Sequence, residues 1–183
     1  PSDMCPGCFG SEGKDPVCPA CGFDTSVPQS PLALPLRTVL KGRYVVGRVL
    51  GKPGGFGITY LGWDLQLETT VAVKEYLPRE LAGRATNHIT IQPHSDEDAD
   101  NCAFGLRQFV DEARTLARVG HLNVVRCRTF LEASGTAYRV MDYYKGMSLA
   151  EYLAGQGGTL PGKQAIDIMR RVMDGLREVH SKG

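Results

Sequence analysis

The apolar positions along the chain predict a set of short strands followed by helices. Residues 44–50 form a β-branched stretch bounded by glycines, which is typical of a strand. A glycine-rich turn follows, and a second apolar run at 58–61 predicts the return strand of a hairpin. Residues 71–76 predict a further strand, with Lys74 in its interior. The first part of the fold is therefore expected to be a β-sheet.

Two helices are predicted from spacings of three and four residues. Phe109, Ala113 and Leu116 mark the buried face of a helix over 103–119. At 100° per residue, Glu112 lies about 60° from Phe109 on that same face. A carboxylate on a buried face needs a cationic partner, and Lys74 is the best candidate. A second helical apolar face is formed by Ile166, Met169, Val172, Met173, Leu176 and Val179.

Composition and charge narrow the class of protein. Of the 183 residues, 42% are hydrophobic and 22% charged, which excludes wholesale disorder as well as collagen-like or coiled-coil order. Lys+Arg 21 against Asp+Glu 20 gives a net charge of +1, so no polyanion-binding surface follows. No apolar run approaches the roughly 20 residues of a membrane span, and the polar N-terminal residues lead us to expect no signal peptide. We therefore expect a cytoplasmic protein without a membrane segment.

Four of the six cysteines form two Cys-x-x-Cys pairs, Cys5 with Cys8 and Cys18 with Cys21. Two such pairs supply the four thiolates of a tetrahedral metal site, so the spacing predicts a zinc-ribbon or rubredoxin-like knuckle pair over 1–23, with zinc favoured over iron. Two disulfides or a redox pair are the alternatives, but disulfides require an oxidising compartment. The segment is too short to build a core, so the metal would supply its folding energy.

Residues 24–40 form a proline-rich linker between the knuckles and the predicted sheet. Proline makes such a segment extended and semi-rigid. Residues 1–40 carry two basic and four acidic side chains, a net charge of −2. A nucleic-acid-binding ribbon is normally basic, so we expect no nucleic-acid partner.

The turn between the first two predicted strands contains Gly51, Gly54, Gly55 and Gly57. Glycines there let the backbone approach a phosphate group closely. A Rossmann loop would instead lead into a helix, and the Walker pattern is absent. Lys74 is open to two interpretations, a solvated lysine on a polar face or a lysine directed at nucleotide phosphates. Pairing with a helix glutamate beside such a hairpin favours the second, because that assembly positions a triphosphate.

Together these motifs resemble the N-lobe and the start of the C-lobe of a bacterial eukaryotic-like (Hanks-type) Ser/Thr protein kinase. The resemblance covers roughly 41–183 and rests on the glycine-rich hairpin 51–60, Val71-Ala72-Val73-Lys74, Glu112 in FVDEARTLARV, HLNVV at 121–125, YRVMDYYKG at 138–146 and the helical patterns at 148–153 and 166–179. It implies an α+β fold. Residues 41–144 would form an N-lobe of a five-stranded antiparallel sheet plus a helix, and 145–183 would begin the C-lobe.

The resemblance also implies roles for individual residues. Lys74 and Glu112 would be the catalytic pair, with Lys74 on the α- and β-phosphates of ATP. The other nucleotide-binding positions would be Gly51, Gly54, Gly55 and Gly57 at the phosphates, Thr59 and Ala72 at the adenine, Met141 as gatekeeper, and the backbone of Asp142 and Tyr143 at the adenine edge. The implied cofactors are ATP and Mg²⁺, with Mg²⁺ ligands beyond Gly183, and the partner is a protein substrate phosphorylated on Ser or Thr.

The sequence departs from the family pattern in two ways. Lys52 stands where the first glycine of GxGxxG should fall and Pro53 follows it. Neither the H-R-D-x-K-x-x-N loop nor D-F-G occurs within 1–183, so these residues alone are expected to be inactive, as part of a kinase. A pseudokinase scaffold with a zinc-binding N-terminus is one alternative. A metal-ribbon nucleic-acid binder is another, which the charge of 1–40 disfavours.

Overall fold

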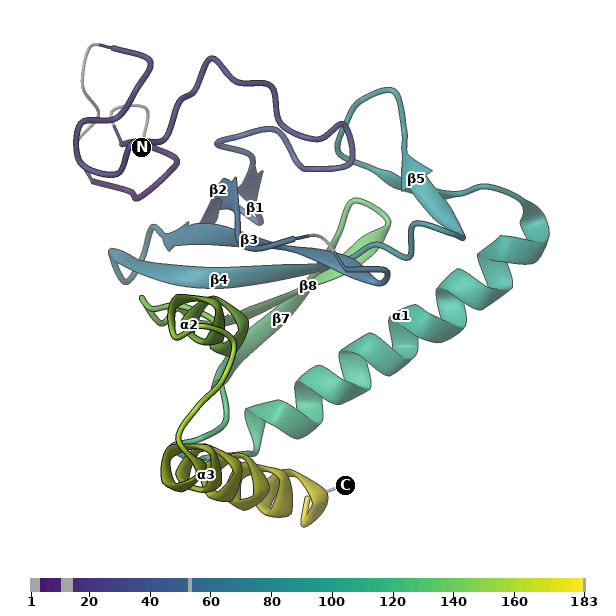
Figure 1. Cartoon of the computed structure of the whole chain (residues 1–183). Helices are drawn as coiled ribbons and strands as arrows, with labels where there is room; N and C mark the ends of the chain where they lie inside the picture. The colour runs from purple at the N-terminus through teal and green to yellow at the C-terminus, as the bar shows by residue number, and fades with distance from the viewer. Residues whose placement is uncertain (1–3, 11–14, 53, 183) are drawn as a thin grey trace.

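The computed structural model describes residues 4–10, 15–52 and 54–182. Pro53 lies outside the described residues, as do parts of the predicted knuckle segment 1–23. The fold is α+β, as predicted: an antiparallel sheet with a long helix on one side and two further helices below it (Figure 1). The expected five strands are joined by a sixth, because the end of the linker adds a short strand, β1, at the sheet edge. The strands run in the order β1(Val39–Leu40), β2(Tyr44–Val49), β3(Gly57–Asp64), β4(Thr69–Tyr76), β8(Thr136–Asp142) and β7(Cys127–Ala133).

Strand register decides which side chains share a face of this sheet. Residues directly opposite one another on antiparallel strands point to the same side. Thr59 is opposite Lys74, Lys74 is opposite Arg139, and Ala72 is opposite Met141. These five residues define what we call the α1 face of the sheet, and the intervening residues point to the opposite face.

The opposite face carries the largest apolar core of the described residues. Its centre is formed by buried side chains of the sheet, including Tyr60, Val73 and Val140. A separate two-stranded hairpin, β5(Ala82–Arg84) and β6(Ile91–Pro93), covers this face together with Ala33 and Leu34 of the predicted linker. Leu34 is fully buried, and its backbone N–H donates to the Tyr60 hydroxyl at 3.0 Å. The linker is therefore built into the core over part of its length.

A buried ion pair joins the hairpin to the sheet. Glu75 on β4 and Arg84 on β5 are almost fully inaccessible, and Arg84 Nη2 lies 2.5 Å from Glu75 Oε2. The Tyr60 hydroxyl donates to the same carboxylate oxygen at 2.8 Å, and Arg84 also donates to the Leu32 carbonyl at 2.7 Å. The Arg84 guanidinium therefore links the hairpin, the linker and the sheet through its hydrogen bonds and its ion pair.

Helix α1(Asp96–Ala117) includes most of the apolar pattern at 103–119 and extends to Ser95, which caps it by accepting from the Asp98 N–H at 3.1 Å. It packs on β7 and β8. Phe109 and Val110 of the helix form a small core with Tyr76 and Ala137 of the sheet.

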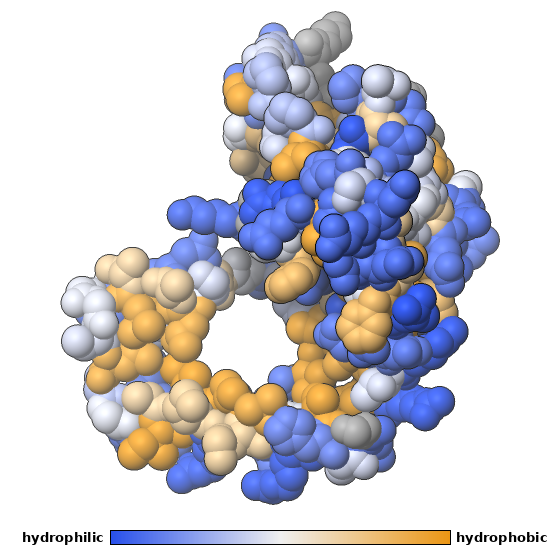
Figure 2. Space-filling model, turned by 90° about the vertical axis from the view of Figure 1, so that its right-hand side faces the viewer, coloured by the Kyte–Doolittle hydropathy of each residue, from blue (hydrophilic) through white to orange (hydrophobic). Residues whose placement is uncertain are grey.

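Helices α2(Leu149–Gly155) and α3(Gly162–His180) follow the sheet, as their patterns predict. Helix α3 meets the segment before β7 at Gly175, where an added Cβ would lie 3.0 Å from the Asn123 carbonyl. The predicted apolar face of α3 is mostly exposed, at Ile166, Met169, Val172, Met173 and Leu176. Figure 2 shows apolar side chains around a wide opening in the lower part of the molecule, where Figure 1 places α2 and α3. Among the described residues, no helix is both long and apolar enough to cross a bilayer.

Candidate functional site

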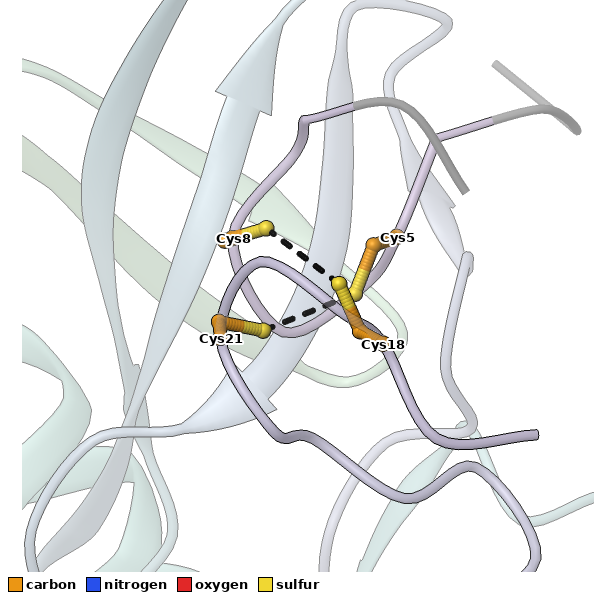
Figure 3. Close-up of side chains that lie close together, drawn as sticks. All are labelled: Cys5, Cys8, Cys18 and Cys21. Atoms are coloured by element: carbon orange, nitrogen blue, oxygen red, sulfur yellow. Dashed lines mark hydrogen bonds between the residues drawn. The ribbon is translucent and has the colours of Figure 1, made fainter. Parts of the chain in front are cut away.

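The four N-terminal cysteines converge on one point. Their Sγ atoms all lie within 4.8 Å of one another, and all four thiols are free (Figure 3). Cys5 and Cys21 are separated by 3.8 Å between sulfurs, and Cys8 and Cys18 by 4.0 Å. A tetrahedral ion with metal–sulfur bonds of about 2.3 Å holds its ligands about 3.8 Å apart. The cluster therefore fits a single tetrahedral metal ion, and these separations are too long for disulfides.

Backbone groups hold the two knuckle turns in similar conformations. The Gly7 N–H donates to the Cys5 sulfur at 3.2 Å, and the Cys5 N–H donates to the Gly10 carbonyl at 2.9 Å. The Cys18 N–H donates to the Phe23 carbonyl at 2.9 Å. Burial raises the pKa of the Cys5 thiol to about 12, whereas backbone N–H groups, chiefly that of Ala20, lower the pKa of Cys18 to about 7. The pKa values of Cys5 and Cys18 are thus shifted in opposite directions.

The first knuckle is docked on the sheet. Its Pro6 carbonyl accepts from the Arg48 N–H at 2.9 Å, and its Gly7 carbonyl accepts from Arg48 Nε at 2.9 Å. Phe9 is buried in a cluster with Val45 and Leu61, around which Met4, Leu50, Trp63, Leu65 and Tyr143 pack. Leu61 is opposite Ala72 in the register, so the knuckle covers the β2–β3 end of the α1 face.

Gly47 on β2 permits this docking. A Cβ at Gly47 would lie 2.4 Å from the Pro6 carbonyl oxygen and 3.0 Å from the Phe9 ring. We expect Gly47→Ala to push the knuckle off β2 and to lower the free energy of unfolding by about 1–3 kcal/mol, as overpacking does. Denaturant unfolding measures this change. Gly120→Ala is the matched control, since a Cβ there meets open space. Equal effects of the two substitutions would show that the close contact is not maintained.

A strip of the α1 face remains between the knuckle at one end and α1 at the other. Thr59, Ala72, Lys74 and Met141 lie along this strip on three adjacent strands, so the sheet brings together four of the residues predicted to bind nucleotide. Thr59, Lys74 and Met141 are half-buried and Ala72 is buried. Tyr143 follows β8 and packs against the Phe9 cluster. The cysteine knuckle and the strip are therefore neighbours on one surface.

The glycine-rich hairpin leads into β3 two residues before Thr59. Gly57 must lack a side chain, because a Cβ there would lie 2.1 Å from the Glu75 carbonyl oxygen. Gly51 turns the chain with φ of 67°, and the surroundings of Gly55 are open. The Gly54 N–H donates to the Gly57 carbonyl at 3.1 Å, so it is used within the loop.

The backbone at the end of β8, directly after Met141, is also partly engaged in hydrogen bonds within the protein. The Asp142 N–H donates to the Arg126 carbonyl at 3.0 Å, and the Asp142 carboxylate accepts from Arg128 Nε at 2.5 Å. The backbone N–H of Asp142 is therefore not available to a ligand in this conformation.

The structure gives Glu112 a different partner from the one predicted. Its carboxylate pairs with Arg139 through two contacts, Oε1–Nη1 at 2.7 Å and Oε2–Nη2 at 2.8 Å, and its side chain is 58% exposed rather than buried. The hydrogen bond from Arg139 lowers the pKa of Glu112, and Lys74 adds a weaker electrostatic contribution. Among the described residues, no carboxylate lies within ion-pair distance of the Lys74 ammonium. The reason is the position of α1, which packs on β7 and β8 and so brings Glu112 to a residue of β8 rather than of β4.

Arg139 and Glu75 were not identified from the sequence as members of ion pairs. Arg139 lies two positions before Met141 on the same strand, so a period of two would have placed it on the same face. Glu75 follows Lys74 on β4, so a period of two places it on the opposite face of the sheet, together with the buried Val73 and Leu77. The same period would therefore have predicted that the Glu75 side chain points into the core.

Comparison with known proteins places these features in a family. A family profile described as "Protein kinase domain" matches residues 44–183. The serine/threonine-protein kinase pkn2 of Myxococcus xanthus is 34% identical over 145 residues, which is 79% of this chain and 15% of that protein. PrkC of Bacillus subtilis is 30% identical over 141 residues, which is 77% of this chain and 18% of that protein.

Solved structures show the same fold. The structure described as "PpkA-294 apo form" has a TM-score of 0.64 at 35% identity and matches 68% of this chain and 43% of its own. The kinase domain of Mycobacterium tuberculosis PknI has a TM-score of 0.61 at 23% identity and matches 82% of this chain and 52% of its own. The chain thus spans about half of these solved chains and less than a fifth of the two curated relatives. The family profile matches residues 44–183, and the sheet and the long helix match those of solved kinase structures. This chain therefore belongs to the protein kinase domain family and covers part of that domain.

Proposed function

We propose that this chain is the ATP-binding portion of a serine/threonine protein kinase, which transfers the γ-phosphate of ATP to Ser or Thr of a protein substrate. The observation that carries the proposal is the strip of the α1 face, where Lys74 lies with Thr59, Ala72 and Met141 beside a glycine-rich hairpin. An adenine ring would contact the small and apolar side chains, and the Lys74 ammonium would meet the α- and β-phosphates.

The rest of the kinase domain supplies what these residues lack. In the family, the catalytic base and the Mg²⁺ ligands follow the helix that α3 resembles. The exposed apolar side chains of α3 suit burial against such a continuation. Mg²⁺ is therefore proposed to be held between ATP and residues beyond Gly183. A cytoplasmic location and the lack of a nucleic-acid partner remain part of this proposal.

Lys74→Met tests the assignment. We expect it to abolish measurable ATP binding by the 183-residue chain and to reduce phosphotransfer by the full-length protein at least about 100-fold, as loss of one preorganised charge at a reacting phosphate does. Calorimetric titration with ATP and a radiolabel transfer assay provide the two readouts. Lys163→Met, at an exposed position on α3, is the control. Unchanged phosphotransfer by Lys74→Met would refute the role of Lys74. ATP binding without any phosphotransfer by the wild-type protein would favour the pseudokinase alternative.

For the N-terminal knuckles we propose one structural zinc ion held by Cys5, Cys8, Cys18 and Cys21. The support is the sulfur geometry, together with a closed shell of four cysteines that leaves no ligand position open. Zinc is preferred to iron because structural sites of this type are mostly zinc sites. Elemental analysis after purification under reducing conditions should find one zinc per chain. Detection of iron, with the visible absorption of an iron–thiolate complex, would identify the metal as iron instead of zinc. Detection of no metal would refute the proposed site.

A further inference from the structure

Arg139 is a cation buried beneath helix α1. Its side chain is 3% exposed, and its guanidinium carbon lies 4.0 Å from the centroid of the Phe109 ring. It is directly opposite Lys74 in the pairing of β4 with β8, so the two cations are neighbours on the α1 face. Two positive charges thus lie side by side where the proposed nucleotide phosphates would approach.

Glu112 is the carboxylate that balances this buried charge. Both of its oxygens are engaged by the two terminal nitrogens of Arg139, while Arg139 Nε has no hydrogen-bond partner among the described residues. A buried guanidinium that loses its carboxylate is left uncompensated in a poorly solvated site, which is unfavourable. Arg139 therefore depends on Glu112, whereas half-buried Lys74 is more accessible to solvent.

Two cations, Lys74 and Arg139, act electrostatically on the Glu112 carboxylate, and only Arg139 contacts it. The planar fork of an arginine matches both oxygens of a carboxylate, and a lysine ammonium offers only a point charge. Both Glu112 oxygens contact Arg139, and neither lies within 4.0 Å of the Lys74 ammonium, so the carboxylate must move from this position before it can pair with Lys74.

We propose that Arg139 is a positioning residue that holds Glu112 away from Lys74 and thereby limits the fraction of the protein in which Lys74 is fixed for ATP. This inference rests on the proposed ATP-binding role of Lys74 and adds a residue that regulates it. ATP must draw Glu112 from Arg139 to Lys74 when it binds, so its apparent affinity is reduced by the fraction of protein in the paired Arg139–Glu112 state.

Arg139→Met tests the proposal, since methionine keeps an unbranched side chain against Phe109 and removes the charge. We expect a gain of about 10-fold in ATP affinity of the chain and a matching fall in KM for ATP in the full-length protein, within the range of ordinary coupling between sites. Arg114→Met is the matched control, because Arg114 also lies over a phenylalanine ring, Phe130, but pairs with Asp111 at the surface. Arg139→Lys keeps the charge without the fork and should fall between the wild type and Arg139→Met.

Glu112→Gln separates a positioning role from a general structural one. If Arg139 acts through Glu112, the gain from Arg139→Met disappears when Glu112→Gln is also present. A fall in ATP affinity for Arg139→Met, or a gain that persists with Glu112→Gln, would overturn the proposal.

A second readout does not depend on nucleotide. Pairing with Glu112 would shield the Lys74 amine from an acylating reagent, so Arg139→Met should slow acetylation of Lys74, measured by mass spectrometry, and adding Glu112→Gln should restore the rate. If the wild-type protein bound no ATP, the proposed function would fail while the acetylation rates still decided the position of Glu112. Unchanged acetylation in a folded Arg139→Met variant would overturn the proposal by itself. Should Arg139→Met fail to fold, Arg139→Lys provides the same comparison.

Discussion

Replacing Cys5 with serine is expected to release the proposed metal ion and to lower the thermal midpoint of unfolding by about 6–12 °C. Cys5 is buried and supplies one of four sulfurs, so its loss opens the proposed zinc shell. Without metal, the short knuckle segment has no core of its own and should unfold. Phe9 then leaves its cluster with Val45 and Leu61, which costs about 3 kcal/mol or more, as truncation of a buried phenylalanine does. A loss of about 3 kcal/mol corresponds to that temperature shift for a chain of this size.

The measurement pairs elemental analysis with thermal unfolding. Cys102→Ser is the control, since Cys102 lies on α1 outside the cysteine cluster. A chelator added to the wild-type protein should reproduce the shift of Cys5→Ser and should add nothing to that variant. Loss of metal at an unchanged midpoint would show that the knuckles are held on the sheet independently of the metal.

Arg84→Met is expected to lower the free energy of unfolding by about 3–5 kcal/mol, because it leaves one partner of a buried ion pair alone. Glu75 is fully buried and would lose its only ion-pair partner among the described residues. The same substitution breaks the bonds from Arg84 to the Leu32 and Ile89 carbonyls, so linker and hairpin would loosen together. Hydrogen exchange should therefore show faster exchange at Leu34, whose N–H is bonded to Tyr60.

A second variant distinguishes an unpaired charge from a loss of packing. Arg84→Met combined with Glu75→Leu replaces the pair by apolar side chains and should recover most of the lost stability, because such replacements are often neutral or stabilising. Arg170→Met removes an arginine from an exposed pair on α3 and should change stability by less than about 1 kcal/mol. Equal effects of Arg84→Met and Arg170→Met in denaturant unfolding would contradict the buried pair.

Several features of this protein could be read from the sequence because they depend on local chemistry. The spacing of Cys5, Cys8, Cys18 and Cys21 predicts a four-sulfur cluster, and the structure brings the four sulfurs together. The first strands of the sheet and the long helices follow from apolar periodicity, which sets the face that an element can bury, and the α+β class is implied by the family resemblance. The return strand of the glycine-rich hairpin pairs with the lysine strand, and Thr59 lies directly opposite Lys74.

Other features were decided only by the tertiary structure. The partner of Glu112 depends on which strands α1 packs against, and a helical period cannot tell β4 from β8; this is why Arg139 rather than Lys74 holds the carboxylate. The burial of Leu34 and of the Glu75–Arg84 pair depends on segments far apart in the chain closing over one sheet face. The docking of Phe9 beside the proposed nucleotide strip likewise needs Gly47 to meet a turn about forty residues away. Spacing within a segment determined its elements and its four-cysteine cluster, whereas contacts between segments determined which charges pair, because ion-pair partners are selected by distance in space.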